Sequence, residues 1–281
     1  MIYNNPEVNG RINYIQAPLR KKGITMKAMK KVLSLAVVAA MALSVFACSA
    51  ETAETSAEET QAAASELDYM SYEEYDAAAL DSEVTVLCTV MATQSWWEDK
   101  ITVYAQAFDG DGAYFIYNMA CSEEDSVNLG AGTTILVTGF KSEWEGEIEI
   151  ADATFEFTDL VQDNPMAPVD LTADFGNDDA LIAYQNRNFT MTGLTVEASG
   201  DNGEAFLYSW DGSGSQGDDL YFTVSNGETT MTFTVESYLT GADTDVYQAV
   251  EALNVGDTID VAGFLYWYQG ANPHITAVTV L

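Results

Sequence analysis

All five tryptophans of this 281-residue chain lie in polar stretches expected to be loops, and acidic residues adjoin three of them. An indole ring can stack on a sugar or hold a cation over its face, and a neighbouring carboxylate adds an acceptor or a charge. We therefore expect a ligand-binding surface built from these rings and their neighbours. The residues assigned to it are Trp96, Trp97, Glu143, Trp144, Glu145, Trp210, Tyr266, Trp267 and Tyr268.

The same rings have a structural interpretation that the sequence leaves open. They could close the ends of folded units or form the contact between two such units. Trp97 and Trp267 fit this interpretation better, whereas Trp96 and Trp144 have more polar neighbours and fit a binding role better. A contiguous exposed aromatic patch would favour binding.

Other patterns that carry chemistry are weak in this chain. No spacing favours a Ser, His and Asp set, and neither a glycine-rich phosphate loop nor a His and Cys cluster is found. Carboxylate pairs of the glycosidase type carry no signal, because 44 acidic residues make such pairs easy to find. We therefore expect no enzyme, no catalytic residue and no cofactor.

A metal site is not expected either. His274 is the only histidine and has no cysteine nearby, so we interpret it as a strand-edge residue. Asp109 and Asp111 begin like a calcium loop, but Ala113 stands at the next ligand position, and a plain turn is the better interpretation. One acidic loop could hold calcium loosely, although solvated charge is favoured there. Its carboxylates are Asp211, Asp218 and Asp219.

Cys88 and Cys121 allow two interpretations. Outside the cell such a pair could oxidise to a disulfide. The two residues could equally be small and buried, which we favour. Nothing in the expected function depends on this choice.

Charge divides the chain at Cys48. Only three of the 10 Lys and Arg residues follow this cysteine, and only one of the 44 acidic residues precedes it. Proteins bind duplex DNA largely by neutralising its phosphates with Lys and Arg. We therefore expect a neutral or cationic small ligand, a glycan or a surface protein as partner, and no nucleic acid. The three basic residues are Lys100, Lys141 and Arg187.

The segment that ends at Cys48 is predicted to be a secretory signal. A basic stretch precedes the 16-residue apolar run 32–47, which is short for a membrane span of about 20 residues. Residues 45–48 resemble the bacterial lipobox, and this resemblance implies a lipid on Cys48 and attachment to the outer face of the bacterial cytoplasmic membrane. A non-lipidated signal or a retained anchor is the alternative.

These features divide the N-terminal part into three segments. Residues 1–25 are interpreted as a mis-called upstream extension and residues 26–47 as the signal peptide. Residues 48–66 contain no aromatic or branched aliphatic side chain, so we expect a flexible tether, with partial helix as the alternative. The tether would hold the folded part away from the membrane.

Downstream of residue 83, apolar residues alternate with period 2 and turn signals recur about every 8 to 12 residues, a pattern typical of a β-sandwich or barrel. The series then repeats at a constant offset of 124 residues. The chain is thus predicted to contain two copies of one β domain. The matching positions are Leu129, Gly132, Thr134, Ile135, Val137, Gly139, Phe140 and Gly146 with Leu253, Gly256, Thr258, Ile259, Val261, Gly263, Phe264 and Gly270.

The element order in each copy is three strands, a short helix and two strands. This order, and the runs 129–140 and 253–264, resemble the OB-fold, a five-stranded Greek-key barrel. The fold class is therefore all-β, with two tandem five-stranded OB-like barrels, each with a short helix between strands 3 and 4. Residues 67–157 are assigned to the first domain, 158–185 to a linker and 186–281 to the second domain.

OB barrels bind ligands on strands 2 and 3 and in the loops L12 and L45, which join strands 1 to 2 and 4 to 5. The tryptophans fall in or beside those loops. We expect a lipid-anchored, non-catalytic binding module for a neutral or cationic ligand such as a glycan. A protein-interaction or structural module is the alternative, and single-stranded nucleic acid, by analogy with the fold, ranks third.

Overall fold

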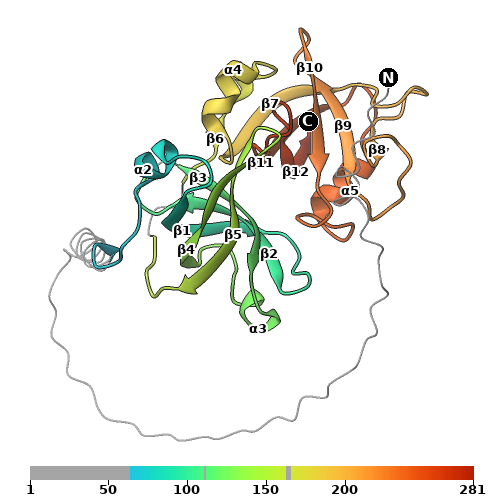
Figure 1. Ribbon diagram of the computed structural model, residues 1–281. Helices are drawn as coiled ribbons and strands as arrows, with labels where there is room; N and C mark the ends of the chain where they lie inside the picture. Colours follow the sequence, from blue (N-terminus) through green and yellow to red (C-terminus); the bar gives the residue numbers. More distant parts are fainter. Residues whose placement is uncertain (1–63, 111, 163–165) are drawn as a thin grey trace, which may run out of the picture. The chain divides into compact units, whose positions relative to one another are not determined.

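The computed structural model describes residues 64–110, 112–162 and 166–281 (Figure 1). The predicted extension, the signal peptide, Cys48 and residues 48–63 of the tether lie outside the described residues, as does Asp111. Within the described ranges, no helix is both long and apolar enough to cross a membrane.

The first barrel is a closed sheet with the strand order β1-β2-β3-β5-β4. A helix with a Ser71 capping box precedes it, and its core gathers alternate strand residues such as Val86, Val103 and Ile116. The elements are α2 (Tyr72–Ala77), β1 (Glu83–Thr93), β2 (Lys100–Ala107), β3 (Ala113–Ala120), α3 (Glu123–Ser126), β4 (Thr134–Trp144) and β5 (Glu147–Phe157).

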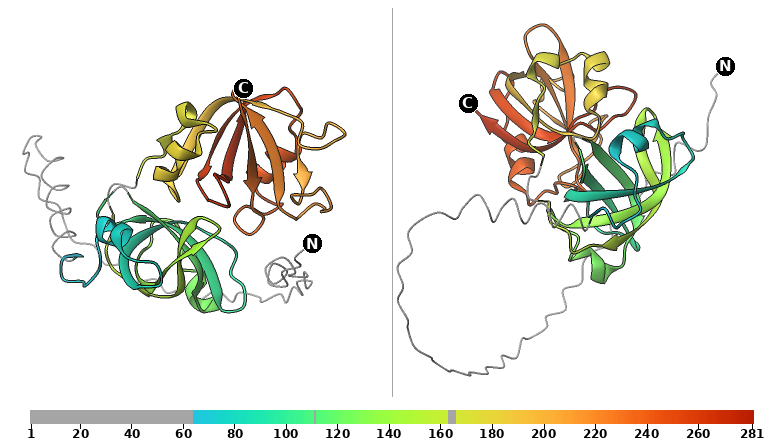
Figure 2. Two further views of the ribbon diagram at one scale, coloured as in Figure 1. Left: turned by 45° about the horizontal axis from the view of Figure 1, so that its top comes forward. Right: turned by 90° about the vertical axis from the view of Figure 1, so that its left-hand side faces the viewer.

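The second barrel repeats this topology with the strand order β7-β11-β12-β10-β9, and the pairing of β7 with β9 closes it (Figure 2). Two short strands, β6 and β8, lie at its edges. The elements are β6 (Val169–Asp170), η2 (Thr172–Asp174), α4 (Asp178–Leu181), η3 (Ile182–Tyr184), β7 (Asn188–Val196), β8 (Leu207–Tyr208), β9 (Leu220–Ser225), β10 (Thr230–Val235), α5 (Asp245–Glu251), β11 (Thr258–Phe264) and β12 (His274–Val280).

These topologies confirm the predicted fold class. Each barrel has five strands and a short helix, α3 or α5, between its third and fourth strands. The expected linker is more than a connection, because β6 pairs with β7 and the side chains of Leu171, Phe175 and Leu181 join the second core.

Repeated glycines occupy equivalent places in the two barrels. A Cβ on Gly139 would lie 2.8 Å from the carbonyl oxygen of Ala151, and one on Gly263 would collide with the carbonyl oxygen of His274. Both glycines stand where the register between strands 4 and 5 shifts. The repeat therefore preserves positions at which two backbones approach too closely for a side chain.

Candidate functional site

The L45 loops of the two barrels contact each other. The backbone N–H of Gln269 donates to the carbonyl oxygen of Glu145 at 2.7 Å, and its side-chain amide donates to the Glu145 carboxylate at 2.8 Å. The Trp267 ring lies against Gly146, and the ring is only 8% exposed. Trp267 is therefore a packing residue between the barrels, which is the structural interpretation that the sequence had left open for it.

The second barrel also covers part of the β2 and β3 face of the first. Tyr104 and Phe115 are buried there against Phe264, and the Tyr104 and Phe264 rings are stacked 4.5 Å apart. Tyr266 is half-buried in the same cluster, with its ring stacked on that of His274 at 4.4 Å. This part of the usual OB binding face is closed by protein.

His274 is buried at the start of β12. Its Nδ1 lies 2.7 Å from the Tyr104 hydroxyl oxygen, and burial lowers its pKa to about 3. The imidazole is consequently neutral at physiological pH. The hydrogen bond between His274 and Tyr104 thus links the second barrel to the first.

The two neighbouring tryptophans of the first L12 loop have opposite environments. The Nε1–H of Trp96 donates to the Cys121 carbonyl oxygen at 2.8 Å, and its half-buried ring packs on the first core. Trp97 is 45% exposed, and its backbone pairs with Lys100. Both residues were assigned to the binding surface, but Trp96 supports the first barrel and Trp97, for which packing seemed the better alternative, is exposed.

The remaining predicted aromatic residues are exposed at the surface. Trp210 is the most open at 70%, and Trp144 and Tyr268 are also exposed. Glu143 and Glu145 are exposed acids beside Trp144. The structure thus separates the predicted set into packing residues and exposed side chains from different loops.

Cys88 and Cys121 are free, buried thiols in the core of the first barrel. The alternative of two small buried residues is therefore the one observed, and the disulfide is absent. Burial raises the pKa of the Cys121 thiol to about 11.

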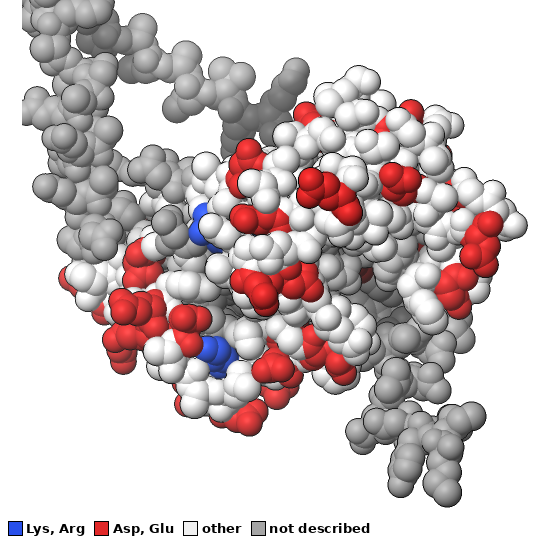
Figure 3. Space-filling model, turned by 90° about the horizontal axis from the view of Figure 1, so that it is seen from above, with Lys and Arg blue, Asp and Glu red and all other residues white. Residues whose placement is uncertain are grey.

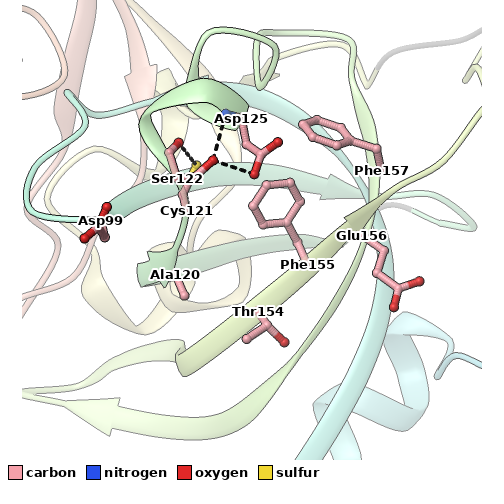
Figure 4. Close-up of a pocket in the computed structure, with 9 residues that line it drawn as sticks. All are labelled: Asp99, Ala120, Cys121, Ser122, Asp125, Thr154, Phe155, Glu156 and Phe157. Atoms are coloured by element: carbon pink, nitrogen blue, oxygen red, sulfur yellow. Dashed lines mark hydrogen bonds between the residues drawn. The ribbon is translucent and has the colours of Figure 1, made fainter.

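A groove with a volume of about 470 Å³ opens in the first barrel between α3 and the end of β5 (Figure 4). Loop L12 contributes one wall, the end of β3 and the start of α3 a second, and β5 a third. We call it the β5 groove. Its lining residues are Asp99, Ala120, Cys121, Ser122, Asp125, Thr154, Phe155, Glu156 and Phe157.

The β5 groove combines an aromatic pair with carboxylates. The rings of Phe155 and Phe157 meet edge to face with centroids 5.0 Å apart. Three separate elements contribute acidic side chains: loop L12 contributes Asp99, α3 contributes Asp125 and β5 contributes Glu156. No Lys or Arg lines the groove. Carboxylates attract cations, and an aromatic face attracts both cations and apolar groups.

Local hydrogen bonds set the position of the helical wall. The Ser122 Oγ accepts the backbone N–H of Asp125 at 3.1 Å and donates to its carboxylate at 2.7 Å, which caps α3. The backbone N–H of Cys121 donates to the Asp99 carbonyl oxygen at 2.9 Å. With the Trp96 bond to the Cys121 carbonyl, these contacts fix the wall opposite β5.

The surface around the barrels offers few cations. Acidic side chains are spread widely over the face drawn in Figure 3, and Lys and Arg show only in small areas. Lys141 is buried, and its Nζ donates to the carbonyl oxygens of Tyr75 and Asp76 at 3.0 and 2.7 Å. The Lys141 ammonium group therefore makes its hydrogen bonds to backbone carbonyl groups within the protein.

The acidic loop of the second barrel does not bring its carboxylates to one point. Asp211 accepts from Ser213, Asp218 from the backbone N–H of Ser215, and Asp219 from Ser237. Among residues 64–110, 112–162 and 166–281, no group of three or more His, Cys, Asp or Glu side chains is arranged to hold a metal ion.

Sequence reasoning missed the β5 groove. Of its nine residues, only Cys121 had been singled out, and for a different reason. The available signal was the pair of phenylalanines at alternate positions of the last predicted strand. Such a pair usually indicates a buried strand face, so it did not mark a surface site.

No known family model matches this chain, and no curated protein matches it. It is similar to a murine DNA-binding protein bound to double-stranded DNA, with 10% identity, a TM-score of 0.33 and coverage of 70% of this chain and 95% of that one. It is also similar to a deletion mutant of the single-stranded DNA-binding protein from Thermus aquaticus, with 13% identity, a TM-score of 0.24 and coverage of 73% and 96%. Likeness at this level concerns the fold only.

One expectation is overturned by these comparisons. Nucleic acid had been excluded as a partner on charge alone, yet the similar structures include DNA-bound proteins and a single-stranded DNA-binding protein. Net charge describes the whole molecule, whereas stacking and backbone N–H contacts to nucleic acid depend on the local surface. The exclusion is therefore withdrawn.

Proposed function

We propose that this chain is a non-catalytic binding module that takes a cationic ligand with an apolar part in the β5 groove. The observation that carries the proposal is the Phe155 and Phe157 pair within a groove whose charged side chains, Asp99, Asp125 and Glu156, are all acidic. The rings provide apolar contact and the carboxylates select the sign of the charge. Trp96 supports the wall through its hydrogen bond to the Cys121 carbonyl oxygen.

The first test is a calorimetric titration with benzyltrimethylammonium, which joins a cation to an aromatic ring. We expect saturable binding that weakens as salt is added, because exposed charges are screened. Benzyl alcohol, the neutral comparison, should bind far more weakly. Substituting both Asp99→Asn and Glu156→Gln should reduce the affinity roughly tenfold, since each exposed charge is worth up to about 1 kcal/mol.

Glu143→Gln is the matched control, because Glu143 is an exposed acid of the first barrel outside the groove. It should leave the affinity unchanged. Equal loss in the control and the groove variant would show that only overall charge matters. The proposal would also be contradicted by binding of a neutral oligosaccharide without the cation, or by a single-stranded oligonucleotide that competes for the groove.

We also propose that the module is displayed from the outer face of a bacterial membrane by a lipid on Cys48. The support is the order of basic stretch, apolar run and cysteine at the start of the chain. A chain that is anchored in this way would present the groove to ligands outside the cell.

A further inference from the structure

The second half of β5 has an open edge. Strand β3 pairs with β5 only at Glu149 and Ile150, whereas β4 continues beside β5 as far as Phe157. Among the described residues, no backbone group pairs with positions 152–157 on the side away from β4. This part of β5 therefore has one paired edge and one free edge.

The backbone groups of two groove residues face that free edge. The N–H of Thr158 donates to the Thr134 carbonyl oxygen at 3.1 Å, and the register pairs Phe157 with Ile135. Bonded and non-bonded pairs alternate along an antiparallel ladder. The N–H and C=O groups of Phe155 and Phe157 consequently point away from β4, toward the groove.

A second hollow of about 240 Å³ adjoins the β5 groove and shares Glu156 and Phe157 with it. Leu136 of β4 also lines this hollow, so it lies over the paired strands β4 and β5 and not along the free edge. Strand residues rise about 3.3 Å each, so the free edge at positions 152–157 is roughly 20 Å long. An open edge of this length suits an extended chain better than a compact small molecule.

Charge decides which extended chain fits. The two hollows carry four acids, Asp99, Asp125, Glu156 and Asp159, and no Lys or Arg. A second copy of this chain is disfavoured because each copy has a formal net charge of −34. A segment rich in Lys or Arg has the complementary sign.

We propose that the open edge of β5 receives an extended basic segment of a partner protein, which adds one strand to the first barrel. The backbone of the segment would bond to Phe155 and Phe157, and its cationic side chains would meet the acids of the two hollows. This inference rests on the proposed function, because it assigns the cation in the groove to a protein side chain.

The test uses the full chain and a peptide that alternates lysine and valine over six residues. We expect the peptide to bind by fluorescence anisotropy and to protect the amides of Phe155 and Phe157 from hydrogen exchange. N-methylation of alternate peptide residues preserves every charge but removes the donors that face the edge. It should weaken binding about tenfold, the order expected for loss of two neutral hydrogen bonds.

Protein variants provide an independent comparison. Phe155→Pro removes an N–H group that does not bond to β4. It should weaken binding of the peptide more than binding of benzyltrimethylammonium. Phe155→Ala keeps the N–H and removes the ring, so it should weaken the small cation more. If Phe155→Pro fails to fold, the N-methylated peptide and the exchange data still decide.

Each outcome separates the two proposals. Equal binding of the methylated and unmethylated peptides, with the small cation still bound, would overturn strand addition and leave the proposed function standing. If neither the peptide nor the small cation binds, both proposals are overturned. Self-association of the chain that Phe155→Pro abolishes would assign the edge to a second copy and overturn the basic partner.

Discussion

At the residue scale, burial changes the protonation of groups between the barrels. Glu147 is fully buried, accepts the N–H of Trp267 at 2.9 Å, and desolvation raises its pKa well above the ordinary value. Burial likewise raises the pKa of Glu236 to about 8. The pKa of His274 shifts in the opposite direction, because burial lowers it and keeps the imidazole neutral.

These shifts determine how stability depends on pH. A carboxyl whose pKa is higher in the folded than in the unfolded protein stabilises the folded state most at pH values below its ordinary pKa. This stabilisation is lost as the pH rises toward the pKa that the carboxyl has in the folded protein. For His274 the contribution is present above its ordinary pKa near 6.5 and is lost as pH falls toward about 3. The two kinds of group therefore oppose each other between about pH 4.5 and 6.5.

Glu147→Gln isolates the carboxyl contribution. Glutamine keeps the size and an acceptor for the Trp267 N–H but cannot ionise. We expect the variant to gain stability relative to the native protein as pH rises from 5 to 8, by at most about 1.4 kcal/mol per pH unit. Urea unfolding at several pH values measures the difference. A constant difference would show that Glu147 ionises normally in the folded protein.

At the element scale, the equivalent L45 loops serve a contact between barrels. The first is the turn from β4 to β5, where Glu145 and Gly146 both have positive φ, as a tight hairpin requires. The absence of a side chain at Gly146 leaves room for the Trp267 ring. A loop that binds ligands in other OB barrels is here part of a protein interface.

Trp267→Ala should therefore destabilise the protein by about 3 kcal/mol or more, the cost of removing a buried tryptophan. Trp144→Ala is the matched control, because its ring is 37% exposed in the loop of the other barrel. Its cost should stay below about 1 kcal/mol. Denaturant unfolding compares the two, and similar costs would mean that Trp267 does not pack as described.

At the scale of the whole molecule, the charge asymmetry at Cys48 links location to ligand. The acidic barrels follow the predicted signal, and the β5 groove offers carboxylates to cations. If Cys48 carries the lipid, Cys48→Ser should abolish fatty-acid labelling and release the protein from the membrane fraction. Unchanged labelling and fractionation in a bacterial host would contradict the anchor.

Much of the fold was predictable because its signals are local or repeated. Alternating apolar residues define strand faces, and the 124-residue repeat places Gly139 and Gly263 at the same step of each barrel. The short helix expected between the third and fourth strands is α5 in the second barrel, where Thr244 caps it. Side-chain exposure was not, since Trp96 and Trp97 are adjacent yet differ in environment.

The sequence by itself therefore determined two β-barrels and the acidic character of everything after Cys48, because periodicity, turn residues and charge are properties of short segments and of totals. Only the tertiary structure decided which aromatic rings face solvent and where the groove lies. Asp99, Asp125 and Glu156 line one groove because barrel closure brings a loop, a helix and the last strand together. Long-range packing of this kind leaves no local pattern in the chain.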